Sequence, residues 1–487
     1  MKVMIVYTRF RGKGVNFVDL SFRVPLGIAY LGAILRKKGF EVYLRDGIFY
    51  ENWDHFKKDL MDVKPDVVGL SFATSLKEFA INYIKIVRDV LPKTKIIAGG
   101  SHPTINPEEV ARDMDVDFTV YGEGEQTFPE LLYVLKENKD YKEIKGMAYN
   151  EDNNVIVNPS RPMLESLDML PWPARDLLPM GEYLKNAPLM PLPYPGTNLL
   201  VSKGCPGNCL FCQPTLRKLT GNKVRYRSVN DVVSEIKFLI KEYKIKSLDL
   251  GVDEPTFSSE WMMEFSNALI KENIKIKWGL ASRVDTVNQE MLKRMAKAGC
   301  VYISYGIESG SQKIMNMLRK GTKVEQAEQA IKWAEQAGIC GRANIMIGSP
   351  GETNETLQET VNFIKRARPD FIFVAATTPL YGTDLYNLAE KEGMLVETKG
   401  GITGYDFGHL KLKDLSNEDL QKGLKDIVNT YKLNLISFIF NPVMLFRKKH
   451  IYIKIINYFL SLLKNRKELV RMLRFYMNYG KQVKVKE

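Results

Sequence analysis

Three cysteines, Cys205, Cys209 and Cys212, stand in a Cys-x-x-x-Cys-x-x-Cys spacing just after a short apolar stretch. Thiolates are the ligands that iron–sulfur clusters take, and a four-iron cluster has one iron more than this loop has cysteines. Three ligands therefore leave one iron open for a small molecule, which a cluster that only passes electrons does not need. Structural zinc is the alternative, but it takes four protein ligands and no nearby Cys or His supplies the fourth.

The remaining cysteines, Cys300 and Cys340, stand alone beside apolar stretches, where a buried and unreactive thiol is the favoured interpretation. An odd number of cysteines with three of them clustered favours metal ligation in a reducing compartment over a disulfide framework. The first residues form an apolar strand pattern without a small-residue cleavage site, so we expect no signal peptide and a cytoplasmic protein.

The cysteine loop follows the first of several apolar stretches that alternate with helical patterns. Strands are predicted at 198–202, 247–252, 275–281, 301–306, 341–347 and 371–376. Six such units indicate a parallel, partly open barrel with its chemistry on the loops at the carboxyl ends of the strands. Charged residues stand at those ends: Asp253, Glu254, Arg283 and Glu308.

An earlier β-α alternation over residues 1–140 predicts a Rossmann-like parallel sheet covered on both faces. Ligands of such sheets bind beyond the carboxyl ends of the strands. Small residues gather there at Ser71, Thr74, Gly99, Gly100 and Gly122, which suggests a binding edge. The alternative for each glycine taken alone is a tight turn.

The rest of the 487-residue chain divides into a connector and a tail. Residues 147–157 predict a hairpin, and the proline-rich stretch 159–195 predicts a linker packed across two domains. The expected boundaries are therefore 1–140, 141–195 for hairpin and linker, 196–400 for the barrel, and 401–487 for a helical basic segment.

The cysteine loop and the strand ends of the barrel resemble the radical S-adenosylmethionine (SAM) enzymes. The resemblance implies that SAM chelates the open iron of a four-iron four-sulfur cluster held by the three cysteines, and that one electron cleaves it to a 5′-deoxyadenosyl radical. It implies an external donor of flavodoxin or ferredoxin type. It places SAM against these side chains: Phe211 at the adenine, Asp253 and Glu254 at the amino group, Arg283 at the carboxylate, and Glu308.

The first domain resembles the cobalamin-binding domain found ahead of many radical SAM enzymes, through Pro25–Leu31, Gly99–Thr104 and Gly122–Glu125. The resemblance implies that the small residues of the binding edge line the nucleotide tail of cobalamin. Other cobalamin proteins carry Asp-x-His-x-x-Gly after the second strand, with the His as lower cobalt ligand. Here Ile48 stands at the His position, so no imidazole can bind cobalt from there.

The net charge of +13 is concentrated in the tail, because residues 447–487 hold twelve Lys and Arg against two Glu, or +10. Apolar runs too short to span a bilayer alternate with these cations, which is typical of a helix lying at a membrane interface. A helical cap on the barrel with a solvated basic face is nearly as well favoured. Contact with RNA is the least favoured of the three.

The sequence thus predicts an α/β protein: a Rossmann-like cobalamin-binding domain, a partial (β/α)6 radical SAM barrel and a C-terminal helical segment. The expected reaction is functionalisation of an unactivated C–H bond in an apolar substrate, for which a lipid is one candidate. Methyl transfer through cobalamin is favoured, and oxidative ring closure or C–C bond formation is the alternative. A cobalamin or SAM sensor is the non-catalytic alternative, and the three-cysteine loop argues against it.

Overall fold

The computed structural model describes residues 1–10, 23–185, 192–212, 223–250, 253–396 and 409–439, with side chains as far as Tyr431 in the last helix. The first apolar stretches form a parallel sheet, as the sequence predicts. In the described ranges its strand order is β2-β1-β3-β4-β5-β6-β7. The strands are β1 Lys2–Tyr7, β2 Glu41–Asp46, β3 Val67–Ser71, β4 Lys95–Gly99, β5 Phe118–Val120, β6 Met147–Glu151 and β7 Asn154–Val157.

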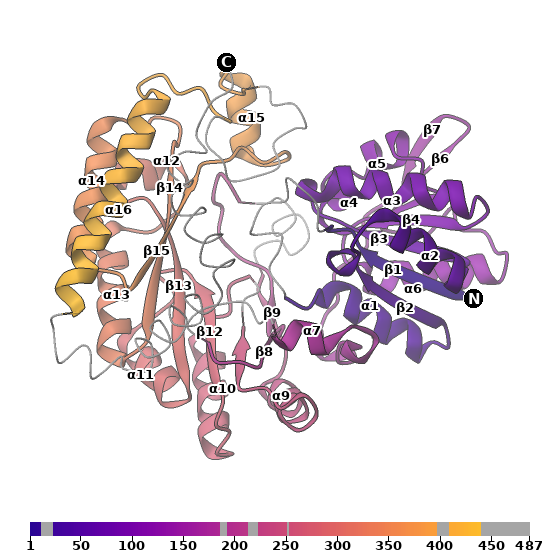
Figure 1. Ribbon diagram of the computed structural model, residues 1–487, viewed down its shortest axis with the longest axis horizontal. Coiled ribbons are helices and arrows are strands. Elements are labelled where there is room, and N and C mark those ends of the chain that lie inside the picture. Colours follow the sequence, from indigo (N-terminus) through magenta and orange to yellow (C-terminus); the bar gives the residue numbers. More distant parts are fainter. Residues whose placement is uncertain (11–22, 186–191, 213–222, 251–252, 397–408, 440–487) are drawn as a thin grey trace.

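Helices cover both faces of this sheet (Figure 1). One apolar core lies under α1 and α6, and a second lies under α2, α3 and α5. The helices are α1 Leu26–Lys37, α2 Trp53–Val63, α3 Lys77–Val90, α4 Ser101–Ile105, α5 Pro107–Asp113 and α6 Gly124–Lys136. The short helix α4 follows directly on Gly99 and Gly100, and α5 follows α4, so the chain turns into a helix at the binding edge.

The hairpin predicted at 147–157 exists as β6 and β7, but it belongs to the first sheet. β6 pairs antiparallel with β5 through Thr119 and Ala148, and so extends the parallel sheet at that side. The linker that follows packs across both domains, as expected. The Trp172 indole N–H donates to Asp231 at 2.9 Å, and the Ala174 N–H donates to the Ala29 carbonyl at 2.9 Å.

The second half of the chain forms a partly open barrel whose parallel strands, in the described residues, run in the order β15-β14-β13-β12-β11-β8. These strands are β8 Gly196–Asn198, β11 Ser247–Asp249, β12 Lys277–Ser282, β13 Cys300–Glu308, β14 Cys340–Ile347 and β15 Phe371–Ala376. The first predicted strand, 198–202, begins two residues earlier and ends at Asn198. A separate antiparallel pair then follows, β9 Ser202–Lys203 with β10 Arg225–Tyr226.

Helices form the outer layer of the barrel around one large apolar core (Figure 1). They are α9 Val229–Tyr243, α10 Ser259–Lys271, α11 Gln289–Lys297, α12 Gln312–Met317, α13 Val324–Ala337, α14 Asn354–Ala367 and α15 Asp384–Lys391. Local signals set their ends: the Ser228 hydroxyl accepts from the Asp231 N–H at 3.3 Å, and Gly338 ends α13 at φ +76°. The linker helix α7, Met180–Lys185, lies between the two domains.

The predicted C-terminal helical segment begins as α16, Asn417–Ile439, which packs on α14. Leu420, Leu424 and Ile427 of α16 are buried in the barrel core, so this part of the segment is a cap on the barrel. The basic stretch from Arg447 onward lies outside the described residues. Among the described helices, none combines the length and the apolar character that crossing a bilayer requires.

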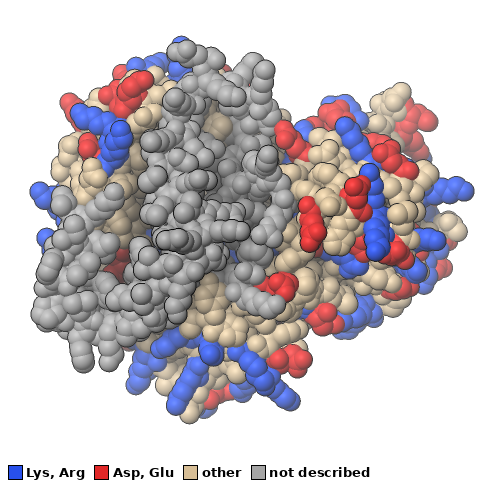
Figure 2. All heavy atoms as spheres, in the orientation of Figure 1, with Lys and Arg blue, Asp and Glu red and all other residues tan. Residues whose placement is uncertain are grey.

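Charge on the described surface is uneven. Lys and Arg side chains gather at the lower end of the barrel in Figure 2, whereas both signs are mixed over the N-terminal domain. Exposed lysines, including Lys244, Lys246, Lys275 and Lys277, stand just before or at the start of β11 and β12. They therefore lie at the end of the barrel opposite the cysteine loop.

Candidate active site

The cysteine loop begins after Lys203 at the end of β9. Its first residue is hydrogen-bonded to the segment that follows β11. The Gly204 N–H donates to Asp253 Oδ2 at 2.5 Å. A Cβ added to Gly207 would lie 3.4 Å from Cys205 Sγ and 3.7 Å from Cys209 Sγ, so both sulfurs face the same stretch of backbone. The Cys212 N–H donates to the Cys209 carbonyl at 3.2 Å, which turns the loop back on itself.

The Cys205 thiol is under opposing electrostatic influences. Burial raises the pKa of Cys205, while the Gly207 N–H and the Arg283 guanidinium act in the opposite direction. Arg283 Nη1 lies 3.9 Å from Cys209 Sγ. Within the described ranges, no three or more His, Cys, Asp or Glu side chains lie close enough together to hold a metal ion. The donor set on the loop, three thiols beside a cation, is the type that an iron–sulfur cluster takes.

Arg283, predicted to hold the SAM carboxylate, already grips a carboxylate of the chain. Its Nε and Nη2 each donate to Asp285 at 2.8 Å, and Nη2 also donates to the Lys320 carbonyl at 3.0 Å. This two-point ion pair is of the strong, charge-assisted kind. The guanidinium therefore has Nη1 left for the cysteine loop, and its position beside Cys209 is fixed.

The adjacent carboxylates Asp253 and Glu254 have different surroundings. Glu254 is buried and already bonded: Oε1 accepts from the Thr256 hydroxyl at 2.6 Å and Thr286 at 3.2 Å, and Oε2 accepts from the Arg283 N–H at 3.0 Å. Burial raises the pKa of Glu254. Asp253 instead faces the cysteine loop and has a left-handed φ of +46°. Glu254 thus braces the Arg283 turn, while Asp253 stays beside the loop.

Glu308, at the end of β13, pairs with Lys320, a residue that the sequence analysis does not predict for the site. Lys320 Nζ donates to Glu308 Oε1 at 2.9 Å, and both side chains are buried. Burial alone would lower the pKa of Lys320, but the charges of Glu308 and Cys209 hold it above its ordinary value. The ammonium lies 5.9 Å from the ring centroid of Phe211. Lys320 stands in a Leu-Arg-Lys-Gly turn that looks like solvated surface, so the sequence carries no signal for this role.

A hollow of about 560 Å³ opens beside the cysteine loop. The residues lining it come from the loop and from the ends of the second and third barrel strands: Pro206, Gly207, Phe257, Ser259, Arg283, Asp285, Thr286, Val287 and Asn288. The predicted residues Cys205, Cys209, Phe211, Asp253 and Glu308 thus lie with Arg283 at one end of the barrel. Cys300 and Cys340 are buried apart from them, and burial raises the pKa of Cys300 to about 12, as an inert thiol requires.

The predicted edge of the first domain is also brought together. Ser71 and Gly99 are paired in the register of β3 and β4, and the Phe72 N–H donates to the Gly99 carbonyl at 3.1 Å. A Cβ at Gly100 would lie 2.8 Å from the Phe72 backbone and 3.1 Å from Ser71 Oγ, and its φ is +101°. Only glycine suits this place without strain.

Two threonines complete the binding edge. Thr104 Oγ1 donates to the Gly100 carbonyl at 2.7 Å and accepts from the Gly122 N–H at 3.1 Å. Thr74 Oγ1 lies 3.1 Å from His102 Nδ1. The residues predicted for this edge therefore lie at or just after the carboxyl ends of β3, β4 and β5.

Ion pairs join the binding edge to the cysteine loop. Lys203, two residues before Cys205, pairs with Glu125 and lies 3.4 Å from Glu123. Glu123 follows Gly122 directly, and it also pairs with Arg225 of β10. The segment that follows β5 is therefore in direct contact with the start of the cysteine loop.

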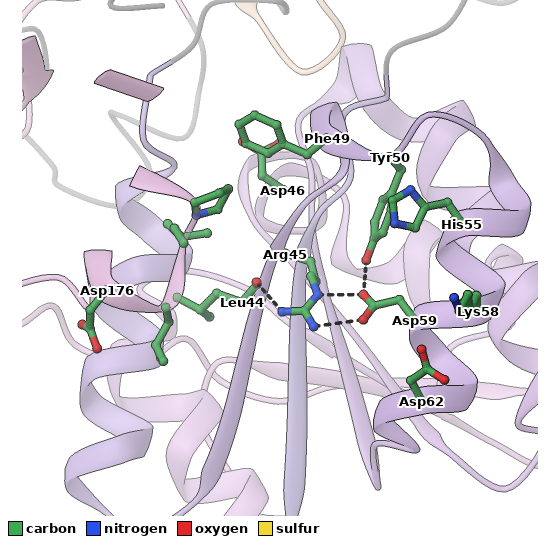
Figure 3. A pocket seen from close by; sticks show the side chains of 13 residues that line it. Leu44, Arg45, Asp46, Phe49, Tyr50, His55, Lys58, Asp59, Asp62 and Asp176 are labelled. Atoms are coloured by element: carbon green, nitrogen blue, oxygen red, sulfur yellow. Dashed lines mark hydrogen bonds and ion pairs between the residues drawn. The ribbon is translucent and has the colours of Figure 1, made fainter. Parts of the chain in front are cut away.

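Beside β2 a second, polar hollow of about 510 Å³ is bounded by the linker (Figure 3). Three of its polar groups bind one another: Arg45 donates to both carboxylate oxygens of Asp59, and Tyr50 donates to Asp59 as well. Asp46, at its wall, is held by Arg9 and by Tyr183. Ile48 is buried on the following turn, so the chain has no polar ligand there.

Comparison with known proteins agrees with both halves of this architecture. The B12-binding domain matches residues 15–132, and the radical SAM superfamily matches residues 199–364. An uncharacterized methyltransferase of Pyrococcus horikoshii is 31% identical over 87% of this chain and 89% of its own length. The anaerobic magnesium-protoporphyrin IX monomethyl ester cyclase of Rubrivivax gelatinosus is 28% identical over 79% of this chain and 69% of its own.

Solved structures show the same fold. The cobalamin-dependent radical enzyme OxsB, with aqua-cobalamin and SAM bound, superposes with a TM-score of 0.71 at 20% identity, over 98% of this chain and 72% of its own. The methyltransferase TsrM of Kitasatospora setae, with cobalamin and a [4Fe-4S] cluster, gives 0.66 at 17% identity, over 82% and 76%. The chain therefore belongs to the radical SAM superfamily as a cobalamin-binding member, an enzyme whose cofactors are SAM, a four-iron four-sulfur cluster and cobalamin.

Proposed function

We propose that this enzyme transfers a methyl group to an unactivated carbon of an apolar substrate. The observation that carries the proposal is the ion-paired junction of Lys203 with Glu123 and Glu125, because it brings the binding edge of the first sheet next to the cysteine loop. A methyl carrier and a radical source can act on one substrate only if they share a cavity. Sequence similarity to the Pyrococcus horikoshii methyltransferase supports the same choice.

The bound groups supply the radical and the transferable methyl, and the residues of the chain hold them. In our proposal Cys205, Cys209 and Cys212 are the cluster ligands. Phe211, Asp253 and Glu308 contact SAM. Glu254 positions Arg283, because it accepts a hydrogen bond from the Arg283 N–H. The Arg283 guanidinium lies beside Cys209 and is already paired with Asp285, so we do not propose it as the sole group that binds the SAM carboxylate.

For cobalamin we propose the edge built by Ser71, Thr74, Gly99, Gly100 and Gly122. Its support is steric and polar: glycines leave the backbone open to a bulky ligand, and hydroxyls offer hydrogen bonds. With Ile48 at the usual His position, cobalt would have no histidine below it from this turn.

The electron comes from an external donor, as in the superfamily generally, and we propose a flavodoxin or ferredoxin. For the substrate we propose a lipid-like molecule reached at the inner face of the membrane. The support is the +10 charge of residues 447–487 with their apolar runs. A relative named hopanoid C-3 methylase, from Methylococcus capsulatus, is 25% identical over 76% of this chain.

Liposome flotation tests the membrane contact. Full-length protein should float with anionic vesicles and be released by salt, whereas a chain ending before Arg447 should stay unbound and still cleave SAM. Absence of binding to anionic vesicles at low salt would instead leave the whole tail as a cap, like the part of α16 that is buried against the barrel.

Labelled SAM tests the reaction itself. Protein reconstituted without oxygen with iron, sulfide and cobalamin is given a reductant, SAM carrying a trideuterated methyl group, and a lipid extract from cells lacking the gene. Methyl transfer should place the label in one lipid and form both 5′-deoxyadenosine and S-adenosylhomocysteine. A variant with all three loop cysteines changed to Ala is the matched control.

Oxidative cyclisation is the second candidate, and the relatives named as cyclases favour it. In the same experiment it would give 5′-deoxyadenosine with a product that has lost hydrogen and carries no label. If this product forms and S-adenosylhomocysteine does not, the function is cyclisation and not methyl transfer.

A further inference from the structure

Lys320 is a buried cation next to the cysteine loop. Its side chain is 7% exposed, and its Nζ donates to Glu308 Oε1 at 2.9 Å. An ammonium carries three hydrogens. In the described part of the chain, Glu308 is the acceptor for one of them, and the ammonium also lies over the Phe211 ring. Phe211 lies between Cys209 and Cys212 in the sequence, so its contact with the ammonium places this cation beside the loop that carries the thiols.

The backbone fixes Lys320 against that loop. The Leu210 N–H donates to the Leu318 carbonyl at 2.9 Å, and Arg283 Nη2 donates to the Lys320 carbonyl at 3.0 Å. The ammonium is packed as well, because a Cβ at Gly306 would lie 3.0 Å from Lys320 Nζ and 2.8 Å from Glu308 Oε1. The charge therefore has a fixed place, which a long side chain on the surface would lack.

Burial strengthens the electrostatic effect of this charge on its neighbours. Inside a protein two charges interact more strongly than in water, because the effective dielectric constant is lower. Arg283 Nη1 lies 3.9 Å from Cys209 Sγ, and the charge of Cys209 is one of the influences that raise the pKa of Lys320. The potential of an iron–sulfur cluster depends on net charge, on hydrogen bonds to its sulfurs and on solvent exposure. A buried cation at this place favours the reduced, more negative cluster, and the carboxylate of Glu308 offsets part of that effect.

We propose that the charge of Lys320 raises the reduction potential of the cluster held by Cys205, Cys209 and Cys212. Glu308 holds the Lys320 ammonium in place. The inference rests on the proposed function only in that these cysteines hold a cluster. It holds equally for methyl transfer and for cyclisation.

The test is a redox titration of reconstituted protein without SAM, followed by electron paramagnetic resonance of the reduced cluster. Lys320→Met should shift the reduction equilibrium about tenfold towards the oxidised form, which is about 59 mV for one electron. Lys320→Arg keeps the charge and should stay near the wild-type potential. Lys313→Met removes an exposed lysine of α12 and should not change it.

Lys320→Met with an unchanged potential and full iron content would overturn the proposal. If that variant fails to fold because Glu308 is left unpaired, the double variant Lys320→Met/Glu308→Gln removes the pair without a buried charge. It should shift in the same direction by a smaller amount, and an unshifted double variant would also overturn the proposal. Wild-type protein that assembles no cluster would count against the proposed function instead, so the two failures are distinct.

Discussion

Arg225 and Glu123 form a two-point ion pair across the junction of the two domains. Nη1 donates to Oε2 at 3.0 Å and Nη2 to Oε1 at 2.7 Å, and the side chains are 12% and 9% exposed. Glu123 follows Gly122 at the end of β5, while Arg225 lies in β10, paired with the strand that leads to Cys205. This pair therefore sets the distance between the binding edge and the cysteine loop.

Replacing Arg225 by Met should lower the free energy of unfolding by about 2 to 3 kcal/mol, because it leaves the Glu123 carboxylate buried with fewer partners. Burial acts to raise the pKa of Glu123 and Arg225 acts to lower it, so that pKa should rise in the variant. Denaturant unfolding measures the loss. Arg36→Met is the matched control, since its pair with Asp176 is about half exposed and should contribute under about 1 kcal/mol. Equal losses for the two variants would contradict the buried junction.

Changing Cys205, Cys209 and Cys212 together to Ala should abolish iron binding and SAM cleavage after reconstitution, because no thiolate would remain on the loop. Iron analysis and the yield of 5′-deoxyadenosine measure both effects. Cys300→Ala removes a thiol that is buried in the barrel core, and it should keep the iron at a cost of about 1 kcal/mol in stability. Iron retained by the triple variant would refute the assignment of the cluster ligands.

Continuous apolar stretches made the barrel strands predictable: 371–376 is the extent of β15, and 341–347 differs from β14 by one residue. The cysteine spacing is equally local. Contacts between distant segments are not local: the Thr286 hydroxyl and the Arg283 N–H that donate to Glu254 come from the turn after β12, about 30 residues along the chain. The sequence therefore could not separate Asp253 from Glu254, nor pick out Lys320.

Gly100→Ala should weaken cobalamin binding and destabilise the first domain. The added Cβ would lie 2.8 Å from the Phe72 N and O atoms, and at φ +101° a side chain is strained by about 1 to 3 kcal/mol. Equilibrium binding of cobalamin and denaturant unfolding measure the two effects. Gly27→Ala is the control, because nothing lies within 4 Å of its added Cβ in α1. Unchanged cobalamin affinity in a folded Gly100→Ala protein would move the cobalamin site away from this edge.

Glu352 should make the stability of the barrel depend on pH near neutrality. Its side chain is buried at the end of β14, where Oε2 accepts from the Gly348 and Ser349 N–H groups. In the described residues Oε1 has no hydrogen-bond partner. Burial raises the pKa of Glu352 from 4.5 to about 7, and the two N–H groups offset only part of that rise.

The folded protein thus holds a proton that the unfolded chain releases. The stabilisation from this group is complete below about pH 4.5, declines as the pH rises towards 7, and is lost above it. Glu352→Gln stays neutral throughout, so its stability relative to wild type should grow by about 2 kcal/mol between about pH 5.5 and about pH 8. Urea unfolding across that range measures the difference. Glu359→Gln, an exposed change on α14, should give a flat difference, and a flat difference for Glu352→Gln would mean that its carboxyl is ionised throughout.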